Sequence, residues 1–149
     1  MKNEKTFYMN LQQSEIDLIK RTFALVNTIG DLTARFFYER LFELSPETRL
    51  LFTGNMQNQR GKFMATLNFI VQTLDQPQTL QATTRRLGRE HARYHVSEEH
   101  YQLVGDALLW SLEKALGPAY TSEVHSAWGK LYTLLSDLMK DGARQDSTG

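Results

Sequence analysis

Proline stands at only three positions, 46, 77 and 118, and between them apolar residues recur at three- and four-residue steps. This spacing gathers apolar side chains on one face of an α-helix, whereas a half-buried strand alternates apolar and polar residues. The chain therefore predicts an all-α fold. At 149 residues it has the size of one domain, and its 41% hydrophobic residues are typical of a globular protein.

The same spacing predicts about seven helices, each ended by a turn or capping residue. The first covers residues 12–27, and Asp31 caps the second, which runs to residue 44. Ser45 and Pro46 begin a short helix that ends at Phe52. Further helices are expected at about 57–74, 80–91, 97–116 and 124–138. We expect one domain over residues 12–140, with flexible ends at 1–11 and 141–149.

The charge balance and the missing motifs exclude several kinds of function. Lys plus Arg and Asp plus Glu both number 17, so no net charge draws the chain to nucleic acid or anionic lipid. The chain has no cysteine, which excludes disulfides and thiolate metal ligands. No signal-peptide pattern and no apolar run of ~18 residues is present, which favours a cytoplasmic location without a membrane anchor. No phosphate loop or hydrolase motif is present either.

His91 stands out among the four histidines because it lies one turn after Leu87, on the only apolar stripe of a polar helix. An imidazole there is either a core histidine with satisfied hydrogen bonds or a metal ligand, and the spacing alone favours the first. Tyr38, Phe52 and Phe63 are likewise compatible with ordinary core aromatics. One such histidine among many aromatics also suits a flat apolar cofactor whose metal takes a neutral imidazole.

Four blocks of the sequence resemble, in order and spacing, bacterial single-domain haemoglobins and the globin part of flavohaemoglobins. They are FFYERLFELSPETRLLF, QRGKFMATLNFIV, LGREHARYHVSEEHYQLVGDALL and AWGKLY. The match extends from about Ser14 to Lys140. It implies a globin fold with its helices around one haem pocket. The haem would be haem b, held noncovalently because no cysteine is available to attach it.

The resemblance also implies which residues face the iron. His91 matches the proximal iron ligand, and Tyr38 matches the distal tyrosine of bacterial globins. Gln59 matches the second distal position, although Gln57 is an alternative half a turn away because the preceding connection has an uncertain length.

Further residues would complete the haem pocket by this resemblance. Lys62 and Arg93 would pair with the haem propionates. The alternative, given equal weight, is that both are ordinary solvated charges. The remaining residues would contact the haem or line the pocket: Phe52, Phe63, Leu87, Val96, Tyr101 and Val104.

One departure concerns the glutamate with which flavohaemoglobins bond the proximal histidine. Counted from Trp128, its place falls near Ala143, and neither Asp137 nor Asp141 shares its helical register. We therefore expect the backbone carbonyl of Leu87 to be the partner of the far nitrogen of His91.

The resemblance implies reversible oxygen binding at ferrous haem, with nitric oxide and carbon monoxide as further diatomic ligands. Nitric oxide dioxygenation is also expected, with electrons from a separate reductase, since these 149 residues contain no flavin or nicotinamide segment. The alternative is a haem-based gas or redox sensor that acts through a partner protein. A globin that has lost its haem is the third possibility, against which the joint presence of His91, Phe52 and Tyr38 argues.

Overall fold

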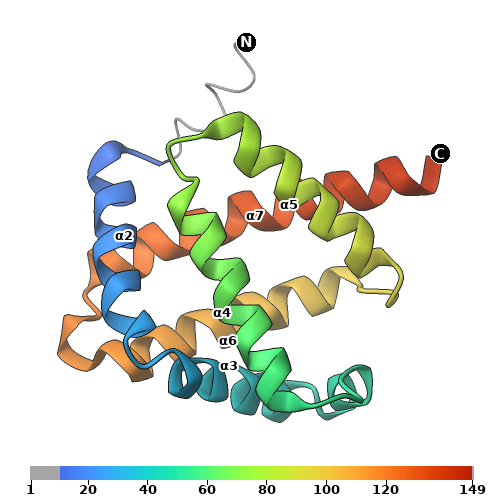
Figure 1. Cartoon of the computed structure of the whole chain (residues 1–149), viewed down its shortest axis with the longest axis horizontal. Coiled ribbons are helices and arrows are strands. Elements are labelled where there is room, and N and C mark those ends of the chain that lie inside the picture. Colours follow the sequence, from blue (N-terminus) through green and yellow to red (C-terminus); the bar gives the residue numbers. More distant parts are fainter. Residues whose placement is uncertain (1–10, 149) are drawn as a thin grey trace.

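The computed structural model describes residues 11–148, with side chains to residue 144. In this part of the chain there are α-helices and two 3₁₀ helices but no strand, which confirms the all-α prediction (Figure 1). The elements in chain order are α2 (Gln13–Asn27), α3 (Gly30–Leu44), η1 (Pro46–Leu51), α4 (Met56–Gln72), α5 (Pro77–Ala92), α6 (Glu98–Leu116), η2 (Gly117–Ala119) and α7 (Ser122–Thr148). No helix among the described residues is long and apolar enough to cross a membrane.

The helices pack mainly in two pairs that are distant in sequence. Helix α3 lies against α6, and α5 crosses α7, as Figure 1 shows. Helix α2 contacts both α4 and α7. At the α2–α7 contact, the fully buried Trp128 donates a hydrogen bond from Nε1 to Oγ1 of Thr22, 2.9 Å away. The indole nitrogen is thus satisfied in the core, where an unpaired donor would be costly.

The crossing of α5 and α7 is a contact between backbones. A Cβ atom at Gly88 would lie 1.9 Å from the carbonyl oxygen of Met139, and one at Gly142 would lie 2.0 Å from that of Arg85. Only glycine therefore fits at either position. The guanidinium Nε of Arg85 also lies 2.7 Å from a carboxylate oxygen of Asp141. Helix α5 is fixed on α7 one turn before His91.

Three local predictions differ from the structure. Helix α7 continues to Thr148 rather than ending near residue 140, because Asp141 and Gly142 contact α5. The segment after Ser45 is a 3₁₀ helix whose cap has no side-chain hydrogen bond. Asp31 is in the first turn of α3 rather than at its cap, which is Ile29. Residues 1–10 of the expected N-terminal extension lie outside the described residues.

Candidate functional site

Tyr38 and Gln59, from neighbouring helices, meet through a hydrogen bond. Tyr38 is buried in α3, and Gln59 lies near the start of α4. Nε2 of Gln59 donates to Oη of Tyr38 over 3.2 Å. The tyrosine is the acceptor in this bond, so its own proton is free to donate elsewhere. Burial raises the pKa of Tyr38 above its ordinary value of 10.0, and the Gln59 bond offsets this only in part, so the hydroxyl remains protonated at neutral pH.

Aromatic rings surround Tyr38 on several sides. The ring of Phe52 meets it edge-on at 5.3 Å, and that of Phe63 meets it at 5.8 Å. Phe63 also stacks on Phe37, with 4.2 Å between ring centroids. Phe52 and Phe63 remain partly exposed. These rings pack against the ring of Tyr38 and hold it among aromatic side chains.

His91 lies in the last turn of α5, and its ring is exposed rather than buried as its apolar stripe indicated. It lies three residues after Gly88, where the α5 backbone touches that of α7. Nδ1 of His91 is 2.7 Å from the carbonyl oxygen of Leu87, which is the contact expected from the sequence. Since a carbonyl only accepts, Nδ1 carries the proton, and in the neutral ring Nε2 keeps its lone pair. This is the form of imidazole that binds a metal.

Of the other predicted lining residues, Leu87 lies on α5, Val96 in the connection that follows it, and Tyr101 and Val104 in the first two turns of α6. Leu87, Val96 and Val104 are partly buried, and Tyr101 is buried. Tyr132 was not predicted from the sequence; its hydroxyl donates to the carbonyl oxygen of Tyr101 over 2.5 Å. Its spacing of one turn from the buried Trp128 was the available signal. Burial is the main cause that raises the pKa of both tyrosines.

The remaining predicted residues lie at the surface. Lys62 and Arg93 are exposed, and neither forms an ion pair with a residue that the structure describes. Asp141 pairs with Arg85, and His91 has the Leu87 carbonyl as its partner in place of an acid. These positions leave the two cations available to an anionic group.

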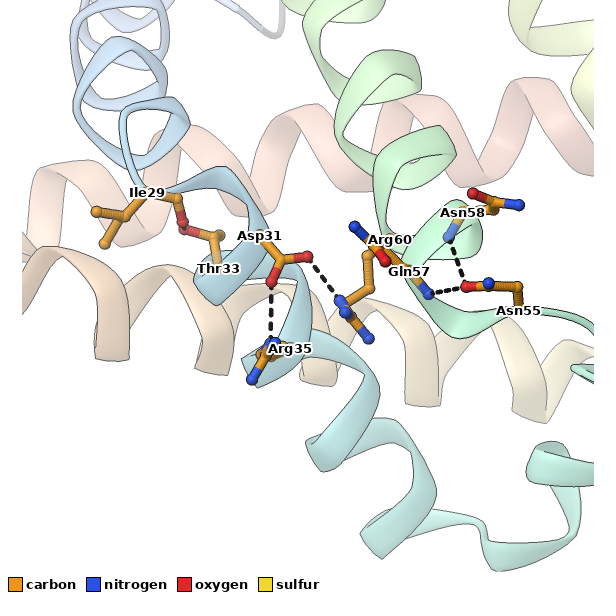
Figure 2. Close-up of polar contacts among 8 residues, drawn as sticks. All are labelled: Ile29, Asp31, Thr33, Arg35, Asn55, Gln57, Asn58 and Arg60. Atoms are coloured by element: carbon orange, nitrogen blue, oxygen red, sulfur yellow. Dashed lines mark hydrogen bonds and ion pairs between the residues drawn. The ribbon is translucent and has the colours of Figure 1, made fainter.

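Helix α4 begins with a side-chain cap at Asn55, and this fixes which of Gln57 and Gln59 faces Tyr38. Oδ1 of Asn55 accepts from the backbone N–H of Gln57 at 2.8 Å and of Asn58 at 3.3 Å (Figure 2). Gln57 is exposed in this first turn, whereas Gln59 reaches Tyr38. The structure therefore places Gln59, not Gln57, beside the tyrosine.

Asp31 makes two ion pairs close to this helix start. Its carboxylate lies 2.7 Å from Nε of Arg60 on α4 and 2.9 Å from Nε of Arg35 on its own helix (Figure 2). The Arg60 hydrogen bond is the main cause that lowers the pKa of Asp31, and Arg35 adds to it. From the sequence, Asp31 was predicted to be a cap and Arg60 had no predicted role, because their proximity depends on how α3 and α4 pack.

A cleft of about 820 Å³ adjoins Tyr38 along α3, but it is not the expected haem site. It holds neither His91 nor most of the residues predicted to contact haem. Its lining is largely charged or aromatic: Arg35, Tyr38, Glu39, Phe42, Glu43, Arg49, Met56, Arg60 and Trp110. The residues predicted for haem instead belong to two stretches of the chain, one from Tyr38 to Phe63 and one from Leu87 to Val104. A donor hydroxyl with aromatic neighbours and a histidine with a free Nε2 are a donor set that fits haem.

Comparison with known proteins finds relatives over most of the chain. The family model described as Globin matches residues 35–139. The flavohemoprotein of Xylella fastidiosa is 35% identical over 129 residues, which are 85% of this chain and 32% of that protein. The flavohemoprotein of Rhizobium meliloti is 33% identical over 134 residues, or 87% of this chain and 33% of that protein. The chain thus spans about a third of the length of these curated relatives.

Solved structures show the same fold. An engineered carbene transferase, described as a nitric oxide dioxygenase from Rhodothermus marinus, superposes with a TM-score of 0.82 at 29% identity, covering 93% of this chain and 96% of that one. A bacterial globin from Campylobacter jejuni gives a TM-score of 0.80 at 20% identity and covers 93% of this chain and 100% of its own. The second likeness concerns the fold alone.

Proposed function

Since this chain belongs to the globin family, whose members bind haem, we propose that it holds one haem b noncovalently and binds oxygen reversibly. When bound, ferrous haem supplies the site for oxygen and the electron with which nitric oxide and oxygen combine to nitrate, leaving ferric iron. We include nitric oxide dioxygenation in the proposal. One structural neighbour is described as a nitric oxide dioxygenase, and the chain resembles flavohemoproteins over most of its length.

The observation that carries the proposal is the hydrogen bond from Gln59 to Tyr38. Because Gln59 uses Oη of Tyr38 as its acceptor, the tyrosine proton is directed elsewhere and is available to an oxygen ligand. The raised pKa keeps that proton in place at neutral pH. Tyr38 acts as the hydrogen-bond donor in this scheme, and Gln59 orients it.

His91 would hold the iron through Nε2, since its Nδ1 bonds to the Leu87 carbonyl. A neutral carbonyl orients the ring but leaves it less electron-donating than a carboxylate partner would. This difference favours reversible binding of oxygen over strong activation of the bound oxygen. The strong electron push of flavohaemoglobins is not part of the proposal.

Other residues would exclude water and anchor the haem edge. Phe52 and Phe63, which contact Tyr38, would cover the ligand side with apolar rings. Lys62 and Arg93 are exposed cations with no ion pair among the described residues, and they would pair with the propionates.

Sustained nitric oxide oxidation would need a source of electrons. We propose that a reductase outside these 149 residues supplies them, because one oxidation uses the electron that the ferrous iron carries. Without a reductase, one equivalent of nitric oxide per haem should be consumed.

The test is one absorption series on the purified chain in its ferric, ferrous, oxygenated and carbonmonoxy forms, followed by nitric oxide addition to the oxygenated form. The proposal expects a Soret band in each form, reversible oxygenation and one nitrate per haem. Turnover should continue only when a reductase and NADH are added. A chain purified with haem that oxidises at once in air, or consumes no nitric oxide, would contradict the proposed activity.

A further inference from the structure

The start of α4 carries Gln59 but contains no fully buried residue. The first buried residue of this helix is Met64, two turns after its beginning at Met56. Gly61 lies between them with no atom of another residue near the place of its missing Cβ, and glycine within a helix costs up to about 1 kcal/mol relative to alanine. Hydrophobic packing at this place is partial: Phe63, one turn after Gln59, stacks on Phe37 of α3 but stays partly exposed. A polar connection between the two helices can therefore add to the positioning of Gln59 against Tyr38.

The Asp31–Arg60 ion pair connects the same two helices at this place. Asp31 is in the first turn of α3, the helix of Tyr38, and Arg60 follows Gln59 directly on α4. The Arg60 side chain is only 16% exposed, so its aliphatic part is packed while its guanidinium reaches the carboxylate at 2.7 Å. The Asn55 cap, by contrast, bonds only to amides of α4 itself.

We infer that Asp31 and Arg60 are positioning residues for the Gln59–Tyr38 pair. By tying the first turns of α4 to α3, the ion pair keeps Nε2 of Gln59 within hydrogen-bond distance of Oη of Tyr38. Arg35 bonds to the same carboxylate but belongs to α3, so it cannot join the helices. The inference deepens the proposed function, because it assigns residues that control the orientation of its donor.

The test compares oxygen release from the purified haem-loaded protein in the wild type and three variants. Asp31→Asn and Arg60→Gln remove the connection between helices. Arg35→Gln is the matched control, since it removes a guanidinium from the same carboxylate without separating the helices. We expect oxygen release to become about two- to fivefold faster in the first two variants and to stay unchanged in the control, the range that follows from the strength of exposed ion pairs. Carbon monoxide release should not change in any of them.

A double variant separates positioning from a general structural role. Asp31→Asn should have no further effect on oxygen release when it is combined with Gln59→Leu, because the residue to be positioned is then missing. Asp31→Glu should restore most of the wild-type rate. An Asp31→Asn effect that persists in the Gln59→Leu background, or an equal effect of Arg35→Gln, overturns the inference.

A second measurement does not depend on oxygen. Hydrogen exchange at the backbone amides of residues 59–62 should become faster in Asp31→Asn and Arg60→Gln but not in Arg35→Gln. Unchanged exchange in all three variants overturns the inference even if the protein binds oxygen as proposed. A protein that shows the exchange pattern but binds no oxygen would contradict the proposed function while leaving the helix connection intact.

Discussion

Tyr38 is the side chain on which the chemistry of the proposed site most depends. Oxygen bound to ferrous iron carries partial negative charge, whereas carbon monoxide is nearly apolar, so a hydroxyl donor stabilises the first far more. We predict that Tyr38→Phe speeds oxygen release by roughly 10- to 100-fold, because a hydrogen bond to a charged acceptor is worth about 1.5–3 kcal/mol. Stopped-flow measurement of both gases checks this.

Carbon monoxide release is the internal control for that variant and should barely change. Equal effects on the two gases would mean that the Tyr38 ring acts by its size. Gln59→Leu should act in the same direction but less. Because Gln59 bonds to Tyr38 itself, we expect the double variant to be strongly non-additive.

His91 can be compared with a second histidine one turn along the chain. We predict that His91→Ala abolishes stable haem incorporation. It removes the ring that the Leu87 carbonyl orients through Nδ1, and with it the Nε2 atom proposed to hold the iron. His95→Asn is the matched variant and should purify with haem. His95 has a positive φ of 56°, a conformation that asparagine tolerates well. The haem-to-protein absorbance ratio decides, and a colourless His95→Asn with a coloured His91→Ala would overturn the assignment.

The sequence predicted single residues best where a local pattern determined their surroundings. The contact of His91 with Leu87 follows from their spacing of one helical turn, and it is present in the structure. The Asp31–Arg60 and Tyr132–Tyr101 contacts each join residues about 30 positions apart. They depend on how pairs of helices pack, which helical periodicity does not determine.

At the scale of the elements, the close crossing of α5 and α7 predicts a sharp difference between glycines. Gly88→Ala would bring Cβ against the Met139 carbonyl and should destabilise the fold by about 1–3 kcal/mol, the usual cost of overpacking. Gly129→Ala, at a position on α7 where Cβ meets no other residue, should stabilise it by roughly 0.5–1 kcal/mol. Thermal unfolding followed by circular dichroism measures both.

Opposite shifts of the melting temperature are expected, each about 2–4 °C per kcal/mol in a domain of this size. Gly88→Ala should also loosen haem, because it displaces the helix that carries His91. A Gly88→Ala protein as stable as the wild type would show that the two backbones can separate at little cost.

Helix positions were largely predictable because proline, glycine and capping residues divide the apolar repeats. Helix α6 begins after Ser97, whose side chain accepts from the backbone N–H of His100, as expected for a cap. The end of α7 was not predictable from its polar residues. Its support comes from Asp141 and Gly142, whose contacts with Arg85 depend on tertiary packing.

At the scale of the whole molecule, four tyrosines make the free energy of unfolding depend on pH in the alkaline range. These tyrosines are Tyr38, Tyr101, Tyr120 and Tyr132. Burial is the main cause that raises the pKa of each above 10.0, and it raises the pKa of Tyr120 to about 12. Above pH 10 the unfolded chain loses these protons while the folded chain keeps them. The free energy of unfolding should therefore fall as pH rises above 10.

Urea unfolding at pH 8, 9.5 and 11 measures this dependence. The decline above pH 10 should be shallower in Tyr132→Phe, which removes one of the raised groups. A free energy of unfolding that stays level or rises between pH 9.5 and 11 would contradict the prediction.

The contact between Gly88 and the Met139 carbonyl has a mechanical consequence for the two sides of the proposed pocket. Helix α5 rests on the α7 backbone without an intervening side chain, so it cannot yield toward α7. The start of α4 is attached to α3 through side chains only, by the Asp31–Arg60 ion pair and the stacked rings of Phe63 and Phe37, and its first buried residue comes two turns in. The side that carries His91 should therefore resist displacement more than the side that carries Gln59. A bulky ligand would be accommodated by bending the glutamine side outward, with the histidine side left in place.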